Sequence, residues 1–370
     1  MKYVRMPIEI ESPEQMGYSS IECNLTESSF KDMTFGEFNL DLKDLVLCYG
    51  DHLGLSPLRK IIAEEYGLKA DDCLLSVGAA SALFIISTSL LNEGDHLIVV
   101  KPNYGTNIET PKAMGIEMDF LNISFENGFK LSIDEIRKKI KPSTKLISLT
   151  QPHNPTGVML SESEIREVVK ICEEKKIYFL LDETYREMTF KGMTPLAATL
   201  SPYCISVSSL SKTYGLPGIR LGWILTKNPK LQELFLAAKE QIFICHSLLD
   251  ETVALHFYEK MRTKRLEQNL KKIKEHFLIV KSWIESEKRM EWVEPSGGVV
   301  CFPRFKKEAG INTEKFYQIL NQDFKTYVGP GHWFEMPKEF MRIGYGWPTT
   351  KELEKGLKNI SLTLDRLAKH

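Results

Sequence analysis

The sequence predicts an α/β protein with a large domain and a smaller one. Short apolar segments alternate with helical patterns from about Cys73 to Trp223, which is typical of a mostly parallel sheet flanked by helices. Beyond Trp223, long amphipathic helical patterns lead into short strands and helices, which indicates a smaller α+β domain built from the N- and C-terminal segments. We therefore expect a large domain over residues 44–250, and a small domain with bridging helices over residues 1–43 and 251–370.

The composition is that of an ordinary globular protein. The chain has 370 residues, of which 43% are hydrophobic and 26% charged, with a net charge of -1. Nucleic acids and anionic membranes usually require a basic excess, no apolar run approaches membrane-spanning length, and the N-terminus lacks a signal-peptide core. The seven cysteines are scattered without metal-type spacing. We expect a cytoplasmic protein that binds small molecules, without a metal, a nucleic acid or a membrane as partner.

The first clear helix and strand surround a candidate anion site. Residues before Asn39 show no strong periodicity, whereas Ser56 can cap a helix whose first residue is Pro57. The segment CLLSVGAASALFIISTSLL then predicts a buried strand that breaks into an apolar helix. Its first residues, Gly78, Ala79 and Ala80, leave backbone amides free at the positive end of the helix, where a phosphate could bind. A simple strand-to-helix turn is the alternative.

Polar or reactive side chains follow the next strands at their carboxyl ends. Tyr104 comes just after the predicted strand DHLIVVK, and Asn154 comes after TKLISLTQ. The strand IYFLLD ends with Asp182 and is followed by Tyr185, and a strand over Tyr203 to Val207 leads to Lys212. Ligands gather at the carboxyl ends of parallel strands, so one pocket can receive all five of these side chains.

Asp182 is the least ordinary of them. An unpaired carboxylate buried at the end of an apolar strand would cost several kcal/mol, so it should have a cationic partner. The alternative is a capping aspartate that is satisfied by backbone amides.

The loop from Ser208 to Trp223, SSLSKTYGLPGIRLGW, brings together an amine and a guanidinium. A desolvated lysine such as Lys212 can attack a carbonyl to form a Schiff base, and an arginine such as Arg220 suits a phosphate. The pair would fit a phosphorylated cofactor that carries an aldehyde. Taken singly, each could be an ordinary solvated charge.

Together these motifs resemble the class I/II aminotransferases, which are pyridoxal-phosphate enzymes of fold type I in the aspartate aminotransferase superfamily. The cofactor-lysine signature is matched by Ser209, Ser211, Lys212, Gly218, Arg220 and Gly222. The other matches are GAASA from Gly78, HNPTG from His153 and DETY from Asp182, with weaker ones at Tyr49 with Gly54 and at Arg342 in MRIGYG. The resemblance spans roughly Tyr49 to Tyr345.

The resemblance implies a homodimeric aminotransferase that uses pyridoxal 5′-phosphate to move the amino group of an α-amino acid to a 2-oxo acid. Lys212 would hold the cofactor as a Schiff base and act as general base and acid. Asp182 would keep the pyridine nitrogen protonated, while Asn154 and Tyr185 would donate to the phenolic oxygen. A pyridoxal-phosphate-dependent lyase or amino-acid cyclase of the same fold would share this site and stays an alternative.

The resemblance also implies how the remaining site residues act. Tyr104 would stack on the cofactor ring, and the phosphate would be bound by Ser209, Arg220, the loop from Gly78 to Ala80 and the partner's Tyr49. Arg342 would bind the substrate α-carboxylate, with Asn154 and Thr26 nearby.

The segment before Asn39 would line the substrate mouth, and there the chain departs from the family pattern. Thr26, Glu27 and Ser28 stand where many relatives carry a glycine. Together with His246 and Trp333, Glu27 and Ser28 are candidates for lining the substrate pocket, and Glu27 could either face a cationic substrate group or be solvated. A ligand-sensing regulator on the same fold would need a DNA-binding module before Tyr49, where too few residues remain.

Overall fold

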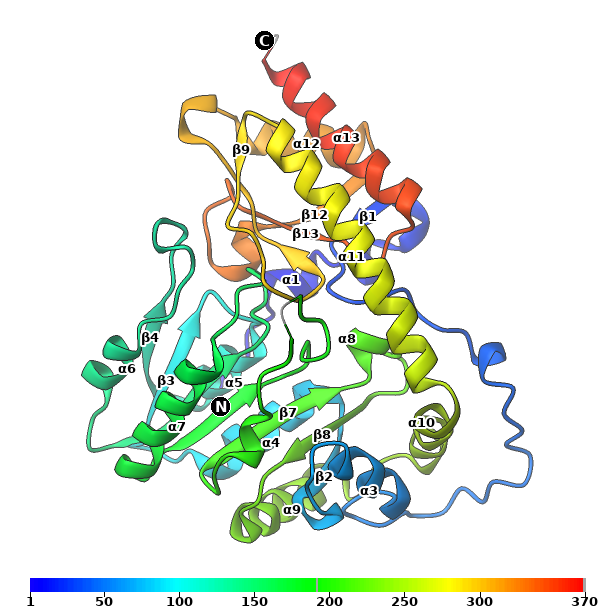
Figure 1. The fold of residues 1–370 in the computed structure, drawn as a ribbon, viewed down its shortest axis with the longest axis vertical. Coiled ribbons are helices and arrows are strands. Elements are labelled where there is room, and N and C mark those ends of the chain that lie inside the picture. The colour runs from blue at the N-terminus through cyan, green and yellow to red at the C-terminus, as the bar shows by residue number, and fades with distance from the viewer. Residues whose placement is uncertain (191, 369–370) are drawn as a thin grey trace.

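A computed structural model describes residues 1–190 and 192–368, and it confirms the α/β fold class. Figure 1 shows a large sheet with its helices in the lower part of the view and a smaller sheet above it. The long helix α11 (Arg262–Ser286) runs between the two parts. The division of the chain at residues 44 and 250 stays a prediction.

The large sheet is seven-stranded and mostly parallel. Its order is β2 (Cys73–Val77), β8 (Leu221–Leu225), β7 (Cys204–Ser209), β6 (Tyr178–Asp182), β5 (Thr144–Thr150), β3 (His96–Lys101) and β4 (Glu117–Asn122). Only β8 runs antiparallel to its two neighbours. The carboxyl ends of β2, β3, β5, β6 and β7 therefore meet the beginning of β8 at one edge of the sheet.

Helices cover both faces of the large sheet because its strands are apolar on both sides. Along β3, Leu97 and Val99 pack in one cluster, whereas Ile98 and Val100 pack in another on the opposite face. One face carries α4 (Gly78–Leu90), α5 (Thr106–Met114) and α9 (Pro229–Phe243). The other carries α3 (Ser56–Glu64), α6 (Ile133–Lys139), α7 (Glu162–Lys175) and α10 (Leu248–Lys260).

Local sequence signals position several of these helices. Helix α7 begins after Ser161, whose hydroxyl accepts from the backbone of Glu164, while the Glu164 carboxylate accepts in return from the backbone of Ser161. The predicted cap at Ser56 is wrong by one residue: Ser56 is the first residue of α3, and Leu55 occupies the cap position. The hydroxyl of Ser56 therefore accepts no capping bond, and Pro57 alone marks the start of this helix.

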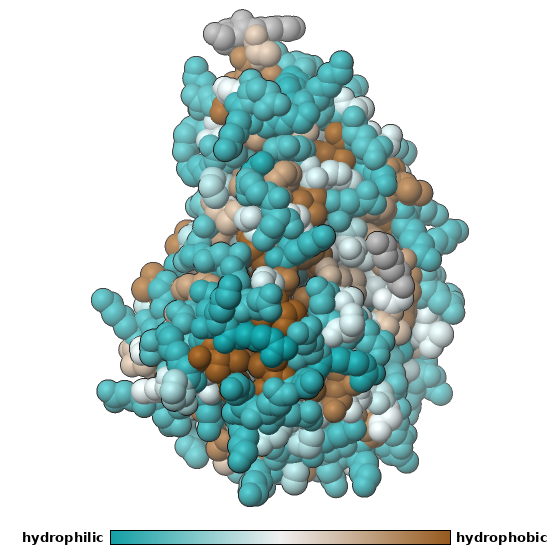
Figure 2. Space-filling model, turned by 60° about the vertical axis from the view of Figure 1, so that its left-hand side comes forward, coloured by the Kyte–Doolittle hydropathy of each residue, from teal (hydrophilic) through white to brown (hydrophobic). Residues whose placement is uncertain are grey.

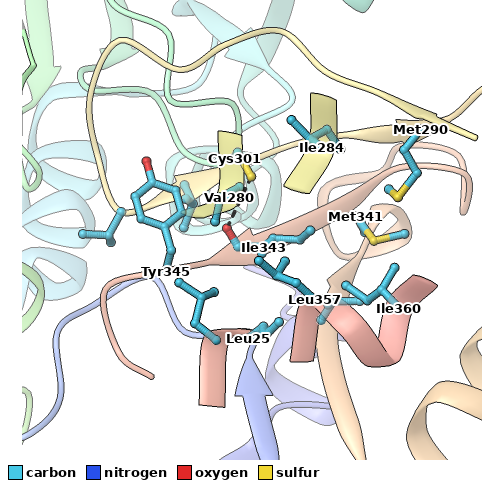
Figure 3. Packing of buried hydrophobic residues seen from close by; sticks show 14 of the residues in the cluster. Leu25, Val280, Ile284, Met290, Cys301, Met341, Ile343, Tyr345, Leu357 and Ile360 are labelled. Carbon is cyan, nitrogen blue, oxygen red and sulfur yellow. Dashed lines mark hydrogen bonds between the residues drawn. The ribbon is translucent and has the colours of Figure 1, made fainter. Parts of the chain in front are cut away.

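The small sheet combines the two ends of the chain. Its order is β1 (Cys23–Leu25), β12 (Thr326–Pro330), β13 (Met341–Gly344) and β10 (Val300–Cys301), and a separate pair is formed by β9 (Met290–Glu291) and β11 (Arg304–Phe305). Helices α12 (Thr313–Gln322) and α13 (Thr350–Leu367) pack beside it. Figure 3 shows the shared core, in which Leu25 lies among residues of β13, α11 and α13.

Short elements complete the chain. Before β1, where the sequence shows no strong periodicity, the structure has α1 (Pro7–Ile10), α2 (Pro13–Met16) and η1 (Tyr18–Ser20). The remaining ones are α8 (Ser211–Tyr214), η2 (Phe35–Phe38), η3 (Ala70–Asp72), η4 (Phe125–Asn127), η5 (Ala197–Thr199), η6 (Lys307–Ala309) and η7 (Gly331–Phe334). Among the described residues, every helix is too short or too polar to cross a membrane, and the face in Figure 2 is mainly hydrophilic.

Candidate active site

One cavity opens at the edge of the large sheet where the five strands end. It is lined by most of the residues that the sequence singled out: Thr26, Ala79, Ala80, Tyr104, Asn154, Asp182, Tyr185, Ser209, Lys212, Arg220 and Arg342. Glu27, Ser28 and Trp333 line it as well. These residues come from widely separated parts of the chain, and the parallel strands bring most of them together.

Two glycines let Arg220 approach the start of α4. A Cβ at Gly78, whose φ is +74°, would lie 2.6 Å from Nη2 of Arg220. A Cβ at Gly222 would lie 2.5 Å from the carbonyl carbon of Gly78, so β8 passes directly against the helix start. The guanidinium thus stands beside the first amides of α4, in front of Ala79. An arginine next to a helix N-terminus is well suited to bind a phosphate.

Asp182 ends β6 as a buried carboxylate without a cation. Its Oδ1 accepts from the backbone and the hydroxyl of Thr184, at 3.1 and 2.6 Å, and its Oδ2 lies 3.5 Å from Nδ2 of Asn107. Burial raises the pKa of Asp182, and these neutral donors offset only part of that effect. Within the described chain no arginine, lysine or histidine forms a salt bridge with it. The site therefore fits a ligand that brings a positive charge, such as a protonated pyridine nitrogen.

A chain of polar contacts connects Tyr185 to Arg342. The Tyr185 hydroxyl donates to Oγ of Ser28 at 3.0 Å and accepts from Nδ2 of Asn154 at 3.4 Å. Oδ1 of Asn154 accepts in turn from Nη1 of Arg342 at 3.1 Å. Burial raises the pKa of Tyr185 to about 12, so its hydroxyl is a proton donor at neutral pH. The network fixes two donors, Asn154 and Tyr185, on one side of the cavity.

Arg342 is held rigidly on β13. It is only 4% exposed, its Nη2 donates to the carbonyl of Thr26 at 2.6 Å, and its guanidinium lies 5.0 Å from the ring centroid of Phe334. Burial lowers its pKa, although an arginine remains charged in proteins. Its Nε has no hydrogen-bond partner in the described chain. A buried guanidinium with a free donor is suited to bind a carboxylate.

Lys212 lies in the short helix α8, directly after β7. Its backbone carbonyl accepts a hydrogen bond from the amide of Phe30 at 3.1 Å, which fixes the backbone from which the side chain extends. Its Nζ forms neither a hydrogen bond nor a salt bridge with any residue that the structure describes. An amine that points into a cavity without a protein partner is free to react with a ligand.

His153, in the HNPTG motif, connects two segments that carry residues of the cavity. Its Nδ1 lies 2.8 Å from Oγ1 of Thr156, and its Nε2 lies 2.9 Å from the carbonyl of Pro102. Burial lowers the pKa of the ring to about 4, so the imidazole is neutral at physiological pH. It joins the segments that follow β3 and β5, which carry Tyr104 and Asn154.

Three of the predicted residues do not line the cavity: Gly78, which lies against Arg220 as described above, Tyr49 and His246. Tyr49 is 79% exposed in the irregular segment between η2 and α3. His246, expected as a pocket-lining candidate, instead places Nε2 2.8 Å from the backbone carbonyl of Arg220. The prediction for His246 was wrong because the turn after α9 brings its ring behind the Arg220 loop.

Sequence reasoning missed other residues of the site. Asn107 donates to Asp182 from α5, and no motif marks it. The N-terminal helices contribute Ile8, Glu9, Ser12, Pro13 and Glu14 to the cavity wall. The Ser12-Pro13 pair could have indicated a helix start there, but nothing local places that helix over the large sheet.

The sheet topology and this site define the class: an aspartate aminotransferase-like protein of fold type I. The chain belongs to the aminotransferase class I and II family, whose model matches residues 37–360. Enzymes of this family depend on pyridoxal phosphate.

Three comparisons illustrate the range of its relatives. The crystal structure of a PLP-dependent aminotransferase from Streptococcus suis 89-1591 is similar with a TM-score of 0.91 and 29% identity, over 99% of both chains. The aspartate aminotransferase of Sulfurisphaera tokodaii is 26% identical over 86% of this chain and 83% of its own. The PLP-dependent cyclase OrfR shares the fold, with a TM-score of 0.88 and 24% identity, over 99% of this chain and 98% of its own.

Proposed function

We propose that this protein is a pyridoxal-phosphate-dependent aminotransferase that moves the amino group of an α-amino acid to a 2-oxo acid. The observation that carries the proposal is the pairing, in one cavity, of the unpartnered amine of Lys212 with the buried carboxylate of Asp182. Membership of a pyridoxal-phosphate-dependent family supports it.

The residues of the cavity fit this cofactor. Arg220, Ser209 and the amides at the start of α4, from Gly78 to Ala80, would bind its phosphate. Tyr104 would stack on its ring, and Asp182 would supply the negative charge for the ring nitrogen. When bound, pyridoxal phosphate supplies an aldehyde for amines and a ring that withdraws electrons from the α-carbon.

The reaction requires two tasks from Lys212 and one from Arg342. Nζ of Lys212 would hold the cofactor at rest. Once the amine of the substrate has displaced it, Nζ would take the proton from the α-carbon of the bound amino acid and deliver it to the former aldehyde carbon of the cofactor. Arg342, oriented by Asn154 and the carbonyl of Thr26, would bind the α-carboxylate. Because both groups are fixed to the same cavity, the α-carbon can be held within reach of the amine.

A direct assay tests this function. The purified protein, loaded with pyridoxal phosphate, is incubated with amino donors and a 2-oxo acid, and the new amino acid is measured. We expect amino-group transfer that depends on both reactants. Ammonia or pyruvate released without an acceptor would instead support a lyase, and a cyclised amino acid a cyclase. Absence of any reaction with bound cofactor would contradict all three.

We also propose that the protein acts as a homodimer. Val46, Leu47 and Tyr49 are 72%, 79% and 79% exposed, an unusual exposure for neighbouring apolar and aromatic side chains. A second copy that covers this segment would bury them, and the partner's Tyr49 would then contribute to the phosphate site.

A further inference from the structure

Three carboxylates line the candidate active site and form no salt bridge within the described part of the chain. Glu9 and Glu14 come from α1 and α2, and Glu27 follows β1. The neighbouring Glu11 is paired with His332, whereas none of these three forms a salt bridge with a basic side chain among residues 1–190 and 192–368. In Figure 1, α1 lies between the two sheets.

Glu27 lies next to the group that would bind the substrate carboxylate. The preceding residue, Thr26, accepts from Arg342 at 2.6 Å. Gly344 follows Arg342 by two residues on β13, and a Cβ added to it would lie only 1.8 Å from the backbone carbonyl oxygen of Glu27. β13 therefore packs directly against residue 27, and the charges of Lys212 and Arg342 both act on the Glu27 carboxylate.

The carboxylate of Glu27 is held by neutral and weak donors. Oε1 lies 3.3 Å from the hydroxyl of Tyr18 and 3.4 Å from Nδ2 of Asn24, which is itself fixed by Thr26. Burial raises the pKa of Glu27, Lys212 and Arg342 oppose that rise, and Glu14 adds to it. An ionised carboxylate accepts about four hydrogen bonds, so Glu27 keeps capacity for a charged donor.

Arg342 gives an independent indication of what the cavity binds. It is 4% exposed and lines the same cavity, and its Nε lacks a partner within the described residues. The cavity thus contains a buried guanidinium with a free donor and three carboxylates that form no salt bridge among the described residues. An α-amino acid with a cationic side chain carries complementary charges at its two ends.

We propose that the amino donor is an α-amino acid with a positively charged side chain, of the guanidino or amino type. Arg342 binds its α-carboxylate, and Glu27, with Glu14 and Glu9 further out, binds the side-chain cation. Amino acids with acidic side chains are disfavoured because they would place a carboxylate against three others. This inference rests on the proposed aminotransferase function.

The test compares matched donors in single-turnover reactions of the loaded enzyme, followed by the loss of the visible absorbance of the lysine-bound cofactor. L-Arginine is paired with L-citrulline and L-lysine with L-norleucine, since each pair differs mainly in charge. We expect the charged member to react at least about tenfold more efficiently, the ratio that 1.4 kcal/mol produces. L-Aspartate and L-glutamate should be poorer than either.

Glu27→Gln examines the residue itself. The substitution should reduce the arginine-to-citrulline ratio to within about twofold, because the acceptor loses its negative charge and the ion pair with the guanidinium is lost. Glu22→Gln is the matched control: Glu22 lies on the same segment but pairs with Lys355 away from the cavity, and its substitution should leave the ratio unchanged.

Several outcomes would overturn the proposal. Equal rates for arginine and citrulline in the unmodified enzyme would do so without any variant, as would aspartate or glutamate as the fastest donor. An equal loss for charged and neutral donors in Glu27→Gln would mean that Glu27 only balances Lys212 and Arg342. If no donor reacts although the cofactor is bound, the proposed function fails and this inference fails with it.

Discussion

At the scale of single residues, Lys212 and Asp182 carry the proposed chemistry. Asp182 ends β6, Lys212 lies in α8 just after the adjacent strand β7, and both line one cavity. Their positions could be anticipated because a polar residue after an apolar strand lies at a defined edge of a parallel sheet. The partners of Asp182 could not: Asn107 reaches it from the middle of a helix through tertiary packing alone.

Substitution of Lys212 tests the covalent role. Lys212→Ala should abolish the visible absorbance that pyridoxal phosphate gains when it is linked to a lysine, because no other amine lines the cavity among the described residues. Lys31→Ala is the control, since the Lys31 ammonium lies outside the cavity, 5.6 Å from the ring centroid of Trp347. A band that persists in Lys212→Ala would contradict the assignment.

Asp182 should make the cofactor-free protein less stable as pH rises. Burial raises the pKa of its carboxyl above the unfolded value of about 4, so the folded chain binds this proton more tightly than the unfolded chain does. The free energy of unfolding therefore falls as pH rises above the unfolded value. The loss is about 1.4 kcal/mol for each unit by which the pKa of Asp182 is raised in the folded chain.

Asp182→Asn removes the titrating carboxyl, so comparison of the variant with the unmodified protein measures its effect. Without cofactor, the free energy of unfolding of the variant relative to the unmodified protein should increase between about pH 4 and pH 7, as measured by chemical denaturation at each pH. With cofactor, the same variant should lose transferase activity, because the ring nitrogen loses its counter-charge. If the difference in free energy of unfolding stayed constant with pH, it would contradict a raised pKa of Asp182 in the folded chain.

At the scale of elements, close approach of β8 to α4 shapes the proposed phosphate site. Gly222 lies on β8 where an added Cβ would come within 2.7 Å of the backbone nitrogen of Ala79. The sequence pattern predicted α4, because an apolar segment broken by Gly78 marks it locally, but it assigned Leu221 to Trp223 to a loop and did not predict β8. It did not predict how closely they pack.

Gly222→Ala should therefore destabilise the fold by about 1–3 kcal/mol, since backbone atoms cannot rotate away from the new methyl group. It should also weaken cofactor binding by displacing the first amides of α4. Gly218→Ala, in the loop just before β8, is the control: its Cβ would meet nothing within 4 Å, and its effect should stay within about 0.5 kcal/mol. Thermal unfolding and cofactor titration measure both variants, and equal effects would contradict this explanation.

The small sheet marks the limit of prediction from local sequence. β1 has three residues and pairs with β12, from Cys23 with Thr326 to Leu25 with Val328. So short a strand has no periodicity of its own, and its partner is remote in the chain. The same holds for Glu9 and Glu14, whose place in the cavity depends on where the N-terminal helices pack.

At the scale of the whole molecule, the exposed segment around Leu47 should hold two copies together. Leu47→Asp places a charge in the proposed interface and should shift the protein toward monomers in sedimentation velocity. It should also weaken cofactor binding, because the partner's Tyr49 would be withdrawn. Leu278→Asp is the control, since Leu278 is 63% exposed on α11. Unchanged sedimentation of Leu47→Asp would contradict this interface.

The hydrogen bond between Arg342 and Thr26 joins positions 316 apart in the chain. During translation, Lys212 leaves the ribosome well before the codon for Arg342 has been read. The nascent polypeptide would thus contain the proposed cofactor-binding lysine ahead of the arginine proposed to bind the α-carboxylate. The cavity is therefore complete only near the end of synthesis, when β13 can pack against the segment that the ribosome made first.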